Sequence, residues 1–171
     1  MKRGLFCCLL LVLLLLSCQS QVPETGELMD ALLTEYRHFP PAKIVYDSEA
    51  IPGEQSYMSL RLRSLLYDEG REREIPEFLA VKEYSVYLSE GIFGMEIHIF
   101  RMESRSHARN MAKLLERRAE CMKRRSLYLY APDAYENYLS SAAVFVKENF
   151  VFLLSTGQND EVFSFLCQRI D

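Results

Sequence analysis

The second half of the chain alternates between strand-like and helix-like apolar patterns, and this order restricts the fold more than any other feature. Every second residue is apolar in 84–88 and in 95–99, with Gly91 and Gly94 between the two stretches. Two alternating stretches around a glycine-containing turn predict an antiparallel hairpin. A helical pattern with small and apolar residues on one face follows at about 104–125.

The same order then occurs a second time. Apolar runs at 142–146 and 150–154 flank the polar turn 147–149, which predicts a second hairpin, and a last helix opens at Asn159 or Asp160. The runs of the second hairpin are apolar on both sides, which favours a position where both faces are covered. We therefore expect an α+β fold in which four antiparallel strands form one sheet. The two helices that follow the hairpins are expected on the same face of that sheet.

Two amphipathic helices are expected before the sheet. Thr25 is a plausible N-cap for the first helix, which the prolines at 40 and 41 must end. The second helix is expected at 57–68, and the short run 44–46 between the two helices is a weak candidate for a strand. Residues 128–138 are expected to form a loop broken by a proline. Residues 25–171 thus make a single globular domain of ordinary size.

The N-terminus has the pattern of a secretory signal. Lys2 and Arg3 precede an apolar run over 5–16. This run is too short for a bilayer core, which needs about 20 apolar residues. Residues 1–17 are therefore interpreted as a removable signal peptide rather than a transmembrane helix.

The end of this signal resembles the lipobox of bacterial prolipoproteins. Leu15-Leu16-Ser17-Cys18 has an aliphatic residue three positions before a cysteine and a small residue directly before it, although Leu16 is larger than usual. The resemblance implies that the Cys18 thiol is acylated, that cleavage precedes Cys18, and that residues 18–24 tether the domain to the outer face of the cell membrane. Two or more acyl chains anchor a protein stably, whereas one chain does not. An ordinary secretory peptide cut near Ser20 is the alternative.

Charge and size exclude some classes of protein. Loss of Lys2 and Arg3 with the signal would leave 18 basic residues against 24 acidic ones, a net charge of −6. Nucleic-acid binders need a basic surface, so no nucleic-acid partner is expected. The domain is also too small for a solute-binding lipoprotein with two lobes.

Residues 57–171 show a further resemblance. The shared pattern comprises a helix ending in Tyr67, a strand around Glu83-Tyr84, Glu96-Ile97 in the paired strand, a long charged helix, Tyr130-Ala131-Pro132, and Ala143 to Val146 followed by Lys147-Glu148-Asn149-Phe150-Val151. With this pattern the chain resembles small Gram-positive bacterial lipoproteins that share a domain without assigned activity. It departs from them at Asp68 and at 148–150, where members usually carry a glycine and a Gly-Asn-Tyr-like turn. The resemblance implies no catalytic residue.

Glu96 and His98 are the only pair that suggests chemistry. Two positions apart on a strand, they project from the same face, and together they could begin a metal site or an acid–base pair. The alternative is the wetter face of an antiparallel sheet. Because two ligands without a third make a weak metal site, no catalytic residue, metal or cofactor is expected. Cys121 and Cys167 are expected to be free thiols.

Two surface features are candidates for recognition. Tyr128, Tyr130, Tyr135 and Tyr138 cluster before the second hairpin, and rigid amphipathic rings suit a recognition patch. The alternative is that these rings pack the loop onto the sheet edge. The cations of the helix at 104–125 could contact anionic lipid, but interspersed glutamates favour a solvated face.

The leading functional hypothesis is a non-enzymatic binding or interaction module, anchored to membrane lipid through Cys18 and with an envelope protein as a possible partner. One alternative is an envelope hydrolase or metal-dependent enzyme that uses Glu96 and His98. Another is an accessory subunit of a transporter or envelope machine.

Overall fold

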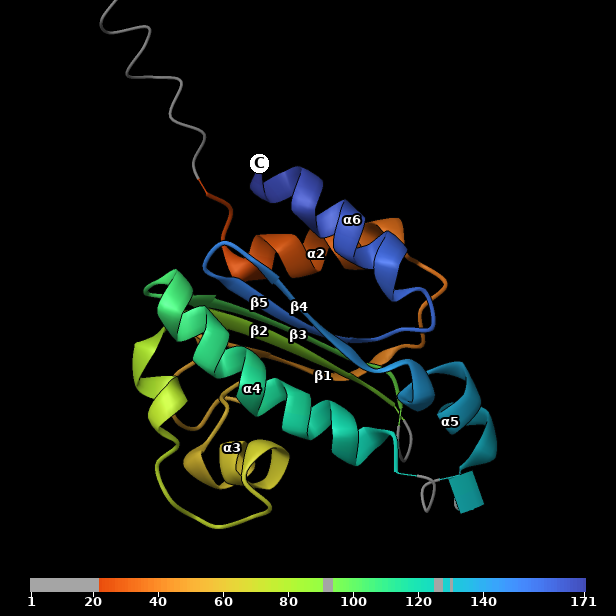
Figure 1. Cartoon of the computed structure of the whole chain (residues 1–171), viewed down its shortest axis with the longest axis horizontal. Helices are drawn as coiled ribbons and strands as arrows, with labels where there is room; N and C mark the ends of the chain where they lie inside the picture. Colours follow the sequence, from red (N-terminus) through yellow and green to blue (C-terminus); the bar gives the residue numbers. More distant parts are fainter. Residues whose placement is uncertain (1–21, 91–93, 125–127, 130) are drawn as a thin grey trace, which may run out of the picture.

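The fold is centred on one antiparallel sheet. The computed structural model describes residues 22–90, 94–124, 128–129 and 131–171. Its strands are β1 (Ala42–Asp47), β2 (Val81–Ser89), β3 (Glu96–Met102), β4 (Ala143–Lys147) and β5 (Phe150–Ser155). They lie in the order β1-β2-β3-β5-β4, and every neighbouring pair is antiparallel (Figure 1). The predicted α+β class with an antiparallel sheet is confirmed.

The sheet has five strands, so the predicted number of four is wrong. The additional strand is β1, whose apolar run at 44–46 is too short to show the alternation typical of a strand. It pairs with β2, where Val45 lies opposite Tyr87. β1 therefore extends the sheet beyond the first hairpin.

The helices surround this sheet. They are α2 (Thr25–Glu35), α3 (Leu60–Tyr67), η1 (Pro76–Ala80), α4 (Arg105–Met122), α5 (Pro132–Asn137), η3 (Leu139–Ser141) and α6 (Asn159–Ile170). Strand β1 lies between α2 and α3 and belongs to the sheet, so the predicted arrangement of two helices before the sheet is not found. The expected loop at 128–138 contains α5, because Pro132 occupies the first turn of a helix, where its missing N–H costs nothing.

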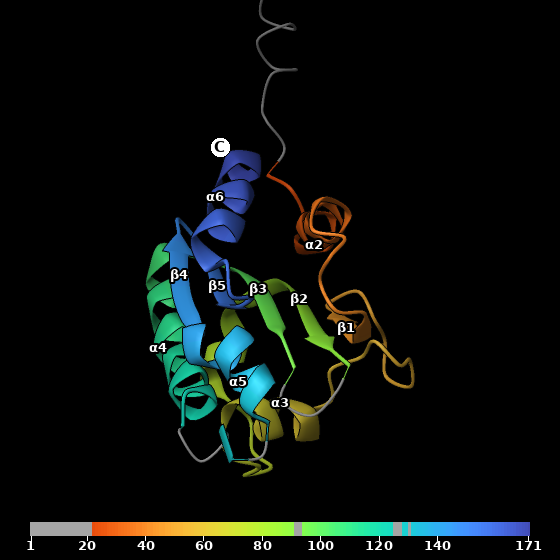
Figure 2. The ribbon, with the colours of Figure 1, turned by 90° about the vertical axis from the view of Figure 1, so that its right-hand side faces the viewer.

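Helices cover both faces of the sheet, so the prediction that α4 and α6 share a face is wrong. Phe100, Val151 and Leu153 pack in the core beneath α4. Ile99 and Phe152, one position away along their strands, pack in the opposite core with α2 and α6. Figure 2 shows α4 on one side of the sheet and α2 with α6 on the other. Because successive side chains of a strand point to opposite faces, strands that are apolar on both faces need a helical layer on each.

The second hairpin is covered unequally. Every residue of β5 is buried, as expected for an apolar strand with helices on both sides. β4 is an edge strand, and Val146 on it is 43% exposed. The expectation that both faces are covered therefore holds for β5 and not for β4.

Candidate functional site

Four side chains form a continuous buried network in the layer between the sheet and α4. The hydroxyl of Tyr67 lies 2.7 Å from Nδ1 of His98, and Nε2 of His98 lies 3.0 Å from a carboxylate oxygen of Glu96. Arg118 approaches both oxygens of that carboxylate, with its Nε at 3.3 Å from one of them. We call these four residues the Tyr67–Arg118 network.

Three elements bring the network together. Glu96 and His98 lie on β3 and point to the α4 side of the sheet, as residues two apart on a strand must. Tyr67 is the last residue of α3, and Arg118 lies on α4. Sequence analysis identified the β3 pair and missed the other two. The helical pattern could have indicated Arg118. It lies three residues after Leu115 and four before Met122, so it is on the same side of α4 as these two buried residues.

The network is buried, so the sequence-based reading of a wet sheet face is wrong. The exposed fraction is 0% for His98 and 9% for Glu96. Burial alone would raise the pKa of Glu96, but the hydrogen bond from His98 and the charge of Arg118 outweigh it and lower that pKa to about 2. Burial lowers the pKa of His98 below 6.5, with Glu96 acting in the opposite direction. At neutral pH the network therefore holds an ionised Glu96 and a neutral His98.

These charge states assign the protons. Nε2–H of His98 donates to Glu96, which leaves Nδ1 to accept from the hydroxyl of Tyr67. Burial and the charge of Glu96 raise the pKa of Tyr67 well above 10, so its hydroxyl keeps its proton. Both nitrogens of His98 and both oxygens of Glu96 are thus engaged inside the protein. Among the residues that the structure describes, no three His, Cys, Asp or Glu side chains are grouped to hold a metal ion.

Acidification should weaken the fold through this network. Above pH 4.5 Glu96 stabilises the folded state, and its contribution, about 3 kcal/mol for a pKa lowered from 4.5 to about 2, is lost as the pH falls between those values. His98 acts in the same direction, because its lowered pKa lets the unfolded chain take up the proton first below pH 6.5. In urea unfolding, the difference in unfolding free energy between wild type and Glu96→Gln should therefore shrink from pH 7 to pH 3.

The matched control is Glu116→Gln on the exposed face of α4, which should match wild type at both pH values. A difference between wild type and Glu96→Gln that stays constant with pH would contradict the assigned charge states.

A second candidate site is a groove of about 780 Å³ on the protein surface between η1 and α4. The η1 wall is mostly apolar but includes Glu77, and polar or charged side chains form the α4 wall. The lining residues are Pro76, Glu77, Leu79, Ala80, Glu103, His107, Asn110, Lys113 and Arg117. We call it the η1–α4 groove. Its two walls come from distant parts of the sequence, and sequence analysis did not identify it.

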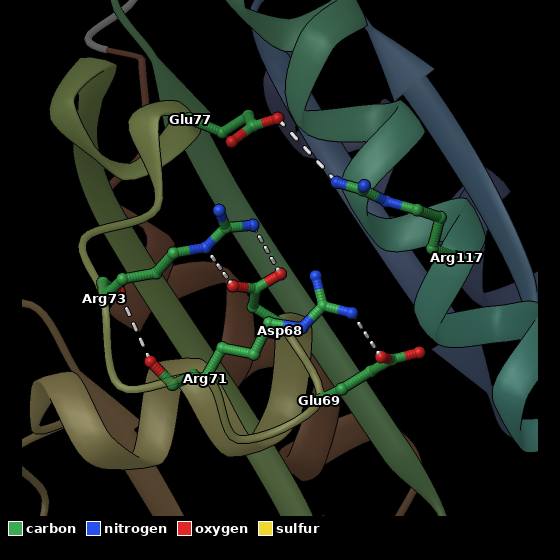
Figure 3. Close-up of polar contacts among 7 residues, drawn as sticks. Asp68, Glu69, Arg71, Arg73, Glu77 and Arg117 are labelled. Carbon is green, nitrogen blue, oxygen red and sulfur yellow. Dashed lines mark hydrogen bonds and ion pairs between the residues drawn. The ribbon is translucent and has the colours of Figure 1, made fainter.

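Exposed ion pairs connect the η1 wall and the segment before it to neighbouring elements. Figure 3 shows Arg117 extending from α4 toward Glu77, and the separation between their charged groups is 3.9 Å. In the segment before η1, Arg73 makes two hydrogen bonds to Asp68, of 2.6 and 3.1 Å. Exposed pairs of this kind each contribute little stability, typically below about 1 kcal/mol. Their main consequence is therefore to orient the segment that leads into the groove wall.

The four tyrosines that were candidates for a recognition patch are placed differently from one another. Tyr128 is 41% exposed and stacks edge-on against Tyr135. Tyr135 packs against the core beneath α4 and donates a hydrogen bond to the carbonyl of Lys123, whereas Tyr138 packs against the opposite core. Tyr130 lies outside the described residues. The described members are thus divided between two sides of the sheet.

The two cysteines of the domain are both free thiols. Cys121 lies on α4 and Cys167 on α6, which places them on opposite sides of the sheet. The two thiols are therefore not bonded to one another.

The expected signal peptide and Cys18 lie outside the described residues. In the described part of the chain, no helix is both long enough and apolar enough to cross a membrane.

Comparison with known proteins found no matching family model, curated protein or solved structure. The resemblance to small Gram-positive lipoproteins therefore stays a prediction, and the function has to be inferred from the residues of this chain.

Proposed function

We propose that this protein is a lipoprotein that binds a partner at the outer face of the cell membrane and does not catalyse a reaction. Acylated Cys18 holds it at the membrane, and the η1–α4 groove receives the partner. The groove is the observation that carries this proposal. In it, Leu79 is 68% exposed beside a row of polar side chains from α4. Exposed apolar side chains rimmed by polar ones are typical of interaction sites.

The position of the groove relative to the tether supports the proposal. The described chain begins at Val22, four residues after Cys18, and such a segment reaches at most about 14 Å. It leads directly into α2, which covers the face of the sheet opposite α4 (Figure 2). A short tether at that face would hold α2 toward the lipid and leave the groove pointing away from it, accessible to an envelope protein.

The state of the Tyr67–Arg118 network supports a binding role rather than hydrolysis. A catalytic base must reach a proton of the substrate within hydrogen-bond distance. His98 is fully buried, and both of its nitrogens are engaged by Tyr67 and Glu96. A network satisfied in this way holds α3 and α4 on β3.

In-cell crosslinking tests the binding site. A photoreactive amino acid at position 79 of the full-length protein should give a discrete adduct in the membrane fraction. The same amino acid at Ile51, which is also exposed (63%) and lies in the loop after β1, outside the groove, should not give that adduct. Lys113→Glu in the groove should reduce the adduct formed from position 79. The absence of an adduct, or an equal yield from position 51, would overturn the proposed function.

A further inference from the structure

We infer that the ligand of the η1–α4 groove is an extended segment of an envelope protein that presents a carboxylate beside an apolar side chain. This inference rests on the proposed function and specifies the partner's chemistry. It follows from the charges, the apolar wall and the openness of the groove.

The charge at the centre of the α4 wall is positive and uncompensated. His107 lies 3.7 Å from Glu103 at one end of the wall, and Arg117 pairs with Glu77 at the other. Between them Lys113 has no carboxylate within 4 Å among the described residues, and its side chain is exposed. Arg117 is therefore engaged by Glu77, whereas Lys113 is left to attract an anionic group.

Asn110 adds a further polar group to the same wall. It precedes Lys113 by three residues, so their side chains are neighbours on the helix surface. A peptide offers backbone hydrogen-bond donors and acceptors, together with a carboxylate, to these polar side chains of α4.

The η1 wall, opposite α4, favours an apolar group on the ligand. Pro76, Leu79 and Ala80 supply its apolar surface, and the Leu79 side chain is 68% exposed. Covering such a side chain with an aliphatic or aromatic group removes apolar surface from water. The groove therefore matches a ligand with an anionic edge and an apolar edge.

The shape of the groove favours a peptide segment. Its volume of about 780 Å³ falls within the range of small-molecule pockets. Those pockets, however, bury most of their ligand, whereas this groove is open to solvent. Its place on the side of the sheet opposite α2 also argues against a lipid headgroup as the occupant.

Selection from a peptide library tests the inference. Full-length protein, purified with its lipid in detergent micelles, is used to select from displayed random 12-residue peptides. The selected peptides should be enriched in Asp or Glu next to Leu, Ile or Phe. For a synthetic peptide from this pool, Lys113→Gln should weaken binding roughly three- to tenfold, as expected for loss of one charged hydrogen bond or ion pair. The matched control Lys43→Gln, on β1, should leave the affinity unchanged.

The outcomes separate this inference from the proposed function. Enriched peptides without acidic residues, no enrichment, or equal binding by Lys113→Gln and wild type would each overturn the inference. If crosslinking from position 79 still yields its adduct in such a case, the binding function stands and only the partner's chemistry is wrong. If that adduct is also absent, the proposed function fails together with the inference.

Discussion

Replacing Glu96 with alanine should lower the free energy of unfolding by about 3–5 kcal/mol, the cost typical of removing one partner from a buried ion pair. The substitution leaves the guanidinium of Arg118 in a largely buried position without its carboxylate, since the Arg118 side chain is only 23% exposed. It also removes the acceptor for Nε2–H of His98. Such a loss is a large share of the total stability of a domain of this size.

Chemical unfolding followed by circular dichroism measures this effect. The double variant Glu96→Ala/Arg118→Met should recover part of the loss, because it leaves no unpaired charge. Glu116→Ala, on the exposed face of α4, should change stability by less than about 0.5 kcal/mol. If the free energy of unfolding of Glu96→Ala lies within about 1 kcal/mol of the wild-type value, the buried network does not stabilise the fold as described.

Local patterns were sufficient to predict most elements of the fold. Alternation at 84–88 and 95–99 corresponds to β2 and β3, and the apolar stripe after residue 104 corresponds to α4. These patterns depend on neighbouring residues and are visible in the sequence. Which face of the sheet a helix covers depends on contacts between residues far apart in the sequence. The prediction that α4 and α6 share a face was therefore wrong. The run 44–46 was only a weak strand candidate and was left out of the predicted sheet, because β1 is identified by its pairing with β2 rather than by its own residues.

The candidate site could likewise be predicted from the sequence only in part. The period of a strand places Glu96 and His98 on one face, but their burial depends on Tyr67 and Arg118, which arrive from α3 and α4. No local signal marks Tyr67 as the partner of His98. The η1–α4 groove likewise requires Leu79 and Lys113, which are far apart in the sequence, to face one another. Sequence patterns therefore identify candidate residues better than they identify sites.

Substitution of Cys18 should have the most complete effect of any change in the chain. An alanine at this position has no thiol for the proposed acylation, so the signal should not be removed and the unprocessed precursor should accumulate. Stable attachment depends on acyl chains that contribute about 0.8 kcal/mol per buried methylene. Cys8→Ala is the matched control, because Cys8 lies within the apolar part of the signal and should leave processing intact.

Metabolic labelling tests the proposed lipid anchor most directly. Cells that express the full-length chain are fed a labelled fatty acid, and the protein is isolated from the membrane fraction. Wild type and Cys8→Ala should carry the label and migrate at the mature size. Cys18→Ala should carry no label and migrate as the larger precursor. Label that persists in Cys18→Ala, or an unlabelled wild type of mature size, would contradict attachment at Cys18.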